Sequence, residues 1–136
     1  MTHPLVAAAR RYIGRPFRHR GRGPRYYDCA GVCICASADI GHVVQDLAHY
    51  GREPHKDGLR EQVRLNMGPP ITGALQPGDI PLMRFERYPH HLGIIGDYGD
   101  GGLSLIHAYA EVGYVCEHRL DAVWQSRIIE AYRWHA

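Results

Sequence analysis

Long hydrophobic runs are missing from this 136-residue sequence. No apolar stretch approaches the roughly 18 residues that a membrane-spanning helix needs, so we expect no membrane insertion. The N-terminus lacks the continuous apolar core of a signal peptide, which predicts a protein assembled in the cytoplasm. No internal repeat or low-complexity tract is present either, and the length fits a single domain over residues 1–136.

Lysine is almost absent, because fifteen of the sixteen basic residues are arginine. Seven of these arginines fall between Arg10 and Arg25, so the first quarter of the chain is strongly basic although the net charge is only +2. No aromatic-interleaved RNA or DNA motif accompanies them, and we expect no nucleic-acid partner. A solvated loop and a cradle for the carboxylates of an acidic substrate remain the two interpretations.

Cysteine is sparse and unevenly spaced. Three of the four cysteines, Cys29, Cys33 and Cys35, lie within seven residues, and Cys116 stands alone. Cys29 and Cys33 would share one helix face, which favours a common buried surface over a disulfide framework. The C-x3-C-x-C spacing lacks the paired knuckles of zinc and iron–sulfur sites, so we expect neither a disulfide nor a metal, although the sequence has ten histidines.

Helical signals dominate the first half of the chain. Pro4–Ile13 has proline in its first turn and Gly14 as a stop, which predicts a helix. The glycine- and proline-rich stretch 14–28 predicts an irregular loop, and the chain from Cys29 to about Ile40 predicts a buried helix that is apolar nearly all round. We expect residues 43–50 to be helical or extended, and residues 59–67 predict a short amphipathic helix ended by Gly-Pro-Pro.

Short strand-like runs follow the turn Gln76-Pro77-Gly78. Gly99-Asp100-Gly101-Gly102 predicts a hairpin, and residues 121–126 predict a helical turn. Helices followed by antiparallel strands predict an α+β domain, with the Cys29 helix packed on a C-terminal antiparallel sheet of about five strands. The predicted strands are Asp79–Phe85, His91–Asp97, Leu103–His107, Gly113–Arg119 and Arg127–Tyr132.

Cys29 is the candidate nucleophile. It stands at the start of the predicted buried helix, where unpaired N–H groups and the helix dipole would stabilise a thiolate and lower the pKa of the thiol. The alternative is that Cys29 is only a small buried hydrophobe.

A cysteine nucleophile needs a base, and that base needs a group to orient it. His91 and His107 lie at the two outer ends of the predicted glycine hairpin, so pairing would place them at the same end of the sheet. Gly93 would share the face of His91 and leave room for the nucleophile helix, whereas His90 would point to the opposite face. We therefore predict a Cys29–His91–His107 triad.

Four motifs occur in a fixed order along the chain. They are G-R-P-F-x(10)-D-C-A-G-V from Gly14, L-x-P-G-D-I-P-L from Leu75, H-L-G-I-I-G from His91 and L-I-H-A from Leu105. Together they resemble the NlpC family of papain-like cell-wall cysteine peptidases. The likeness covers residues 12–134, and the arginine-rich loop and C-terminal sequence are most similar to the phage-tail branch of the family.

The resemblance implies a papain-like fold and a cysteine peptidase that needs no metal or cofactor. Cys29 would be the nucleophile, His91 the general base and His107 the orienting residue, with Asp28 and Phe17 supporting the pocket. The implied substrate is a peptidoglycan stem peptide, whose carboxylates Arg18, Arg20, Arg22 and Arg25 would bind. The phage-tail branch implies a place at the virion tail tip and tail-tip or hub proteins as partners.

The sequence departs from the family pattern at two positions. Phe17 stands where the family usually has tyrosine, which removes a hydroxyl near the predicted site and predicts slower turnover if that hydroxyl assists the oxyanion. Ala30 replaces the usual serine but keeps its backbone N–H. Two other functions stay open: a catalytically silent structural tail-tip protein, and an amidase or acyltransferase acting on another amide.

Overall fold

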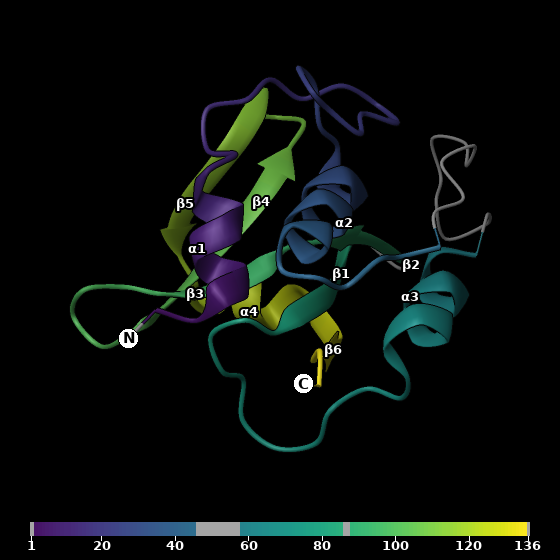
Figure 1. Ribbon diagram of the computed structural model, residues 1–136. Helices are drawn as coiled ribbons and strands as arrows, with labels where there is room; N and C mark the ends of the chain where they lie inside the picture. Colours follow the sequence, from purple (N-terminus) through teal and green to yellow (C-terminus); the bar gives the residue numbers. More distant parts are fainter. Residues whose placement is uncertain (1, 46–57, 86–87, 136) are drawn as a thin grey trace.

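A computed structural model describes residues 2–45, 58–85 and 88–135, with the backbone alone for residues 88–90. Within these ranges three helices are followed by five strands, a fourth helix and a sixth strand, and this segregation confirms the predicted α+β class (Figure 1). None of the helices in these ranges is long and apolar enough to cross a membrane. The elements are α1 (Pro4–Arg10), α2 (Cys29–Asp39), α3 (Leu59–Met67), β1 (Ile80–Phe85), β2 (Tyr88–Leu92), β3 (Ile94–Asp97), β4 (Leu103–Tyr109), β5 (Tyr114–Arg119), α4 (Ala122–Arg127) and β6 (Ile128–Tyr132).

Helix α1 begins as predicted and ends earlier. His3 caps it, because its Nδ1 accepts the backbone N–H of Leu5 at 3.0 Å, and Pro4 occupies the first turn. After Arg10 the backbone N–H of Arg11 donates to the carbonyl of Ala8, three residues back. Such bonds tighten the last turn and end the helix before the predicted limit at Ile13.

Helix α2 is the central helix of the molecule. Its N-cap is Asp28, whose Oδ1 accepts the N–H of Gly31 at 2.7 Å, and its C-terminus is closed by Gly41 in a left-handed conformation. Most of its residues are buried, and it packs against α1, β2 and β4. Figure 1 shows α1 and α2 covering the strands on the same side of the molecule. The prediction of a buried helix from Cys29 is confirmed.

Helix α3 confirms the predicted helix at residues 59–67 and is held by a charged cluster. Glu130 of β6 pairs with Arg60 and Arg64 of α3 and accepts the hydroxyl of Tyr132, and its side chain is only 9% exposed. We call Glu130, Arg60, Arg64 and Tyr132 the Glu130 cluster. Most of the stretch 43–50, predicted to be helical or extended, lies outside the described residues.

The strands form two antiparallel sheets of three, with orders β2-β1-β6 and β3-β4-β5. The sequence predicted a single sheet of about five strands. The difference arises because the run His91–Asp97 is divided at Gly93 into β2 and β3, which join different sheets. Two backbone hydrogen bonds between residues 78–79 and Ile95 hold the two sheets together. The predicted glycine hairpin between β3 and β4 and the helical turn at α4 are confirmed.

Gly93 lies at the point where the chain passes from one sheet to the other. A Cβ atom at this position would come within 2.7 Å of the Leu105 side chain and 3.2 Å of the His107 Cβ. Glycine therefore makes room for β4, not for the nucleophile helix as the sequence predicted.

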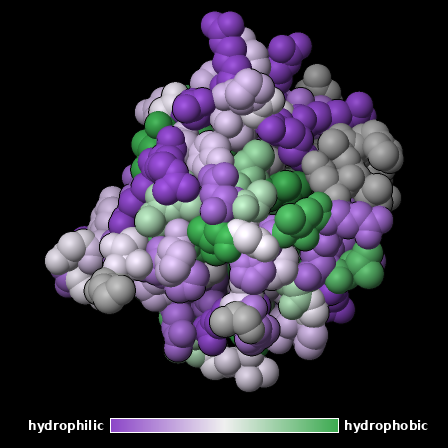
Figure 2. All heavy atoms as spheres, viewed as in Figure 1, coloured by the Kyte–Doolittle hydropathy of each residue, from purple (hydrophilic) through white to green (hydrophobic). Residues whose placement is uncertain are grey.

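The main core lies between the helices and the strands and contains Leu5, Val6, Val32, Leu82, Ile94 and Ile106 among its buried residues. The face in Figure 2 is mostly hydrophilic, with small separate hydrophobic patches. This distribution is ordinary for a folded domain.

Candidate functional site

The irregular loop 14–28 delivers the chain to Cys29, as predicted, and is tied to the start of β5. The N–H of Gly14 donates to the carbonyl of Val115 at 2.9 Å, and the N–H of Phe17 donates to the carbonyl of Gly113 at 2.8 Å. Phe17 is partly buried against the main core. The loop therefore enters α2 from a fixed position.

Asp28 organises the end of this loop. It is 3% exposed, and its carboxylate accepts the N–H of Gly31 at 2.7 Å, the N–H of Arg20 at 3.1 Å and a guanidinium N–H of Arg22 at 2.7 Å. Three donors on one carboxylate fix its orientation. Asp28 thereby fixes both the helix start and the preceding turn.

The four arginines proposed to bind substrate occupy two kinds of position. Arg22 is partly buried against Asp28, whereas Arg18, Arg20 and Arg25 are exposed. The guanidinium carbons of Arg18 and Arg25 lie 5.3 and 5.6 Å from the ring centre of Tyr26. Stacking on an aromatic ring limits the orientations of both guanidinium groups.

Cys29 is the first residue of α2 and is partly buried. Burial raises the pKa of its thiol to about 12, and the negative charge of Asp28 acts in the same direction. Hydrogen bonds from the backbone of Leu92 and Ala30 and the charge of Arg22 lower the pKa, but by less. The sequence predicted a lowered pKa from the helix terminus; the pKa is raised instead, because desolvation, which depends on tertiary packing, is its largest cause.

The same end of α2 lies against β2. Besides the bond between Leu92 and Cys29, the Cys33 Sγ lies 3.5 Å from the carbonyl oxygen of Gly93, one helical turn further on. These contacts place the thiol of Cys29 beside the strand that carries His91.

His91 and His107 come from different sheets and meet through their rings. The Nε2 of His91 lies 2.7 Å from the Nδ1 of His107, a hydrogen-bond distance, and the two side chains are 5% and 0% exposed. The structure thus brings the two predicted histidines together, although β2 and β4 belong to separate sheets. The side chain of His90, the predicted rival of His91, lies outside the described residues.

Aromatic rings enclose this histidine pair. Trp124 of α4 lies edge-on to His107 at 4.8 Å between ring centres, and Tyr109 stacks on His107 at 5.3 Å. Burial lowers the pKa of His107 to about 2, and the charge of Arg127, or of His91 or His118 when protonated, acts in the same direction. His107 is therefore neutral at any physiological pH.

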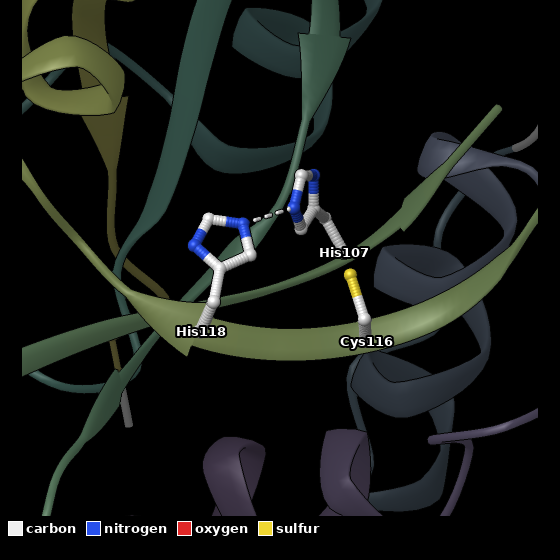
Figure 3. Close-up of side chains that lie close together, drawn as sticks. All are labelled: His107, Cys116 and His118. Carbon is white, nitrogen blue, oxygen red and sulfur yellow. Dashed lines mark hydrogen bonds between the residues drawn. The ribbon is translucent and has the colours of Figure 1, made fainter. Parts of the chain in front are cut away.

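Sequence reasoning missed His118 and Cys116, which also face His107 (Figure 3). Cys116 is directly opposite His107 in the β4–β5 ladder, and His118 is two residues further along the same face. The Nε2 of His118 lies 2.8 Å from the Nε2 of His107, and its Nδ1 lies 2.9 Å from the carbonyl oxygen of Arg119. Pairing the two strands outward from a turn at residues 110–113 would have placed Cys116 opposite His107 and His118 two residues beyond it.

The side chains of His107, Cys116 and His118 have the residue types of a metal site. Their ligand atoms all lie within 4.8 Å of one another. The hydrogen bond between the two Nε2 atoms, however, uses the nitrogen atoms that a metal ion would bind. A metal could enter only by displacing the shared proton, and we therefore treat the group as a hydrogen-bonded one.

Comparison with solved structures identifies the fold. Over 96% of its length the chain is similar to an NlpC/P60 family protein from Bacillus cereus, with a TM-score of 0.69, 20% identity and 39% of that protein covered. The chain has the NlpC/P60 fold. NlpC1 from Trichomonas vaginalis matches at a TM-score of 0.68 and 19% identity, over 96% of this chain and 42% of that one.

One solved NlpC/p60 domain has about the same length as this chain. The NlpC/p60 domain of the peptidoglycan hydrolase SagA matches at a TM-score of 0.61 and 22% identity, over 95% of both chains. The predicted NlpC fold is thereby confirmed.

A curated relative carries a similar sequence. "Probable endopeptidase Cgl2188" of Corynebacterium glutamicum is 29% identical over 118 residues, which is 86% of this chain and 47% of that protein. The chain thus spans about half the length of the curated relatives it matches. No protein-family model matches the chain.

Proposed function

We propose that the chain is a cysteine peptidase that hydrolyses an amide bond of peptidoglycan stem peptides. The observation that carries the proposal is the meeting of His91 and His107 at 2.7 Å beside the helix end that bears Cys29. The NlpC/P60 fold and the endopeptidase and peptidoglycan hydrolase names of similar proteins support the same activity.

In the proposed reaction the thiol of Cys29 is the nucleophile and His91 is the base. Because burial keeps the thiol protonated, we expect its proton to pass to His91 as sulfur attacks the amide carbonyl. The backbone N–H of Cys29, at the first turn of α2, would stabilise the oxyanion. His91 then protonates the leaving amine, and water releases the acyl group from the sulfur.

The proposed substrate carries carboxylates that exposed arginines can recognise. Arg18 and Arg25 are held against Tyr26 on the loop that leads to Cys29, and Arg20 of the same loop is exposed. A stem peptide with acidic residues would suit such a surface, because guanidinium groups bind carboxylates through paired hydrogen bonds. Arg22 already pairs with Asp28, so we assign it to the loop.

Digestion of purified sacculi tests the activity. We expect the native chain to release muropeptides that mass spectrometry assigns to a cut stem peptide, and EDTA to leave the rate unchanged. Cys29→Ala should abolish release, whereas the matched control Cys33→Ala should keep it, because Cys33 is a buried residue one turn further along α2. Equal digestion by Cys29→Ala would overturn the cysteine mechanism.

We also propose that the peptidase is delivered to the cell wall as a component of a phage or phage-like tail tip. The support is the likeness of the arginine-rich loop and the C-terminal sequence to the phage-tail branch of the family. Peptide mass spectrometry of purified virions that encode the chain tests this proposal. Absence of the chain from intact, infectious particles would overturn it and leave the peptidase proposal standing.

A further inference from the structure

Three histidines form a continuous hydrogen-bonded chain that ends on a backbone carbonyl. His91 bonds to His107, His107 bonds to His118, and the Nδ1 of His118 lies 2.9 Å from the carbonyl oxygen of Arg119. We call His91, His107 and His118 the histidine chain. A neutral imidazole carries one proton, so each ring can donate through only one nitrogen.

The carbonyl of Arg119 determines where the first proton lies. A carbonyl oxygen can only accept a hydrogen bond, so the Nδ1 of His118 must donate to it. In the neutral ring the Nε2 of His118 is then an acceptor. The proton in the 2.8 Å contact between His118 and His107 must therefore belong to the Nε2 of His107.

The same argument passes along the chain to His91. With its proton on Nε2, neutral His107 has an unprotonated Nδ1, which must accept the bond from His91 at 2.7 Å. The Nε2 of His91 therefore carries the proton. Its Nδ1, the remaining ring nitrogen, is left unprotonated and can accept a proton from a thiol.

We propose that His118 is a positioning residue that, with the Arg119 carbonyl, sets the tautomers of His107 and His91 so that His91 acts as a base. This inference rests on the proposed function, because it assigns His91 to the reaction with Cys29. The opposite order of protons would turn the Nδ1 lone pair of His118 toward the lone pairs of the carbonyl, which leaves two acceptors facing each other.

The surroundings favour the neutral chain that this argument requires. His107 is fully buried, and Arg127, whose guanidinium carbon lies 4.4 Å from the centre of the Trp124 ring, adds a positive charge nearby. Trp124 also contacts His118, with 5.3 Å between ring centres. The positive charge of Arg127 would therefore repel an additional proton on the histidine chain. The tautomers are then set by the hydrogen bonds between the rings.

Nuclear magnetic resonance of the full-length, 15N-labelled chain in EDTA tests the assignment without any substrate. Long-range 1H–15N spectra at pH 8 report which nitrogen of each ring is protonated. We expect Nε2–H for His91 and His107 and Nδ1–H for His118. A His107 that carries its proton on Nδ1 would overturn the proposal, whether or not the chain digests sacculi.

Substitutions at His118 separate positioning from packing. His118→Leu removes the acceptor for His107, and we expect kcat on muropeptides to fall about 10- to 100-fold with KM unchanged, since a base contributes about 10²- to 10⁴-fold in all. His118→Gln restores an acceptor oxygen and should recover most of kcat together with the Nε2–H signal of His107. A His118→Leu variant that folds and keeps the native kcat and tautomers would overturn the proposal.

Cys116→Ala is the matched control. Cys116 faces His107 from the same strand as His118 but contributes no ring nitrogen to the chain (Figure 3). We expect it to leave kcat and all three tautomers unchanged. If His118→Leu fails to fold, the spectra of the native chain and of His118→Gln still decide the question.

Discussion

The histidine chain and the Glu130 cluster both place polar side chains between elements, around a buried member (His107 and Glu130), but they are stabilised in different ways. The Glu130 cluster joins α3 to β6 by opposite charges, with two guanidinium groups on one carboxylate. The histidine chain joins β2, β4 and β5 by hydrogen bonds between neutral rings. Its rings are enclosed by aromatic side chains instead of carboxylates, as far as the described residues show.

This difference predicts how each group responds to small movements and to substitutions. A pair of opposite charges tolerates small movements, because Coulomb attraction falls slowly with distance. A chain of neutral rings depends on the position of every proton and works only when each donor faces an acceptor. Changes to the histidine chain should therefore affect activity, and changes to the Glu130 cluster should affect stability.

The largest expected effect on turnover comes from substituting His91. His91→Ala should lower kcat about 10²- to 10⁴-fold for each folded molecule, because the proposed base is removed and the buried thiol stays protonated. Turnover of muropeptides measured against the folded fraction checks this. Loss of stability without loss of turnover would contradict the assignment of His91.

Glu130→Leu tests the other cluster. Two arginines and the hydroxyl of Tyr132 lose their shared acceptor, and we expect the free energy of unfolding to fall by about 2 kcal/mol with kcat unchanged. Urea denaturation gives the stability, and Glu61→Gln, at an exposed position of the same helix, is the control. A fall in kcat comparable to that of His91→Ala would break the comparison.

Acid should destabilise the protein through His107. Its pKa falls to about 2 in the folded state from about 6.5 in the unfolded chain, so below about pH 6.5 the unfolded state binds a proton that the folded state does not. Stability should then drop by up to about 1.4 kcal/mol for each pH unit. His107→Gln should flatten this slope, whereas His135→Gln, at an exposed position, should keep it. Urea midpoints between pH 4 and 7 measure both slopes.

The smallest expected effect comes from a fully exposed ion pair. Asp100 pairs with Arg119 on the hairpin side of the second sheet, where solvent surrounds both groups. We expect Asp100→Asn to leave the melting temperature unchanged within error, because exposed pairs are screened and mobile. A clear fall in melting temperature would show that exposed charges matter here as much as the Glu130 cluster.

Local chemistry explains what could be predicted from the sequence. The start of α2 follows from Asp28, whose carboxylate can cap a helix, and the end of α3 follows from Gly68 before two prolines. The glycine hairpin predicted that His91 and His107 lie at the same end of the strands, and the register of β3 on β4 agrees with this, although His91 itself belongs to β2. These features depend on neighbours within one or two elements.

The division of the strands could not be predicted in the same way. The run from His91 to Asp97 alternates identically whether it forms one strand or two. The division falls at Gly93, where Leu105 and His107 of the distant strand β4 approach the backbone closely. His118 was missed because its place beside His107 depends on the β4–β5 register, which begins with Tyr109 opposite Tyr114. The raised pKa of Cys29 likewise depends on burial by distant segments.

Because the chain crosses from one sheet to the other at Gly93, the geometry of the site depends on how α2 and the two sheets are aligned. The thiol comes from a helix, His91 from the first sheet, and His107 from the second. A sliding of one layer by an ångström or two would separate these groups while every helix and strand persisted. Enzymatic activity should therefore disappear at a lower denaturant concentration than circular dichroism, and an assay of turnover would report the docking of the layers before any element melts.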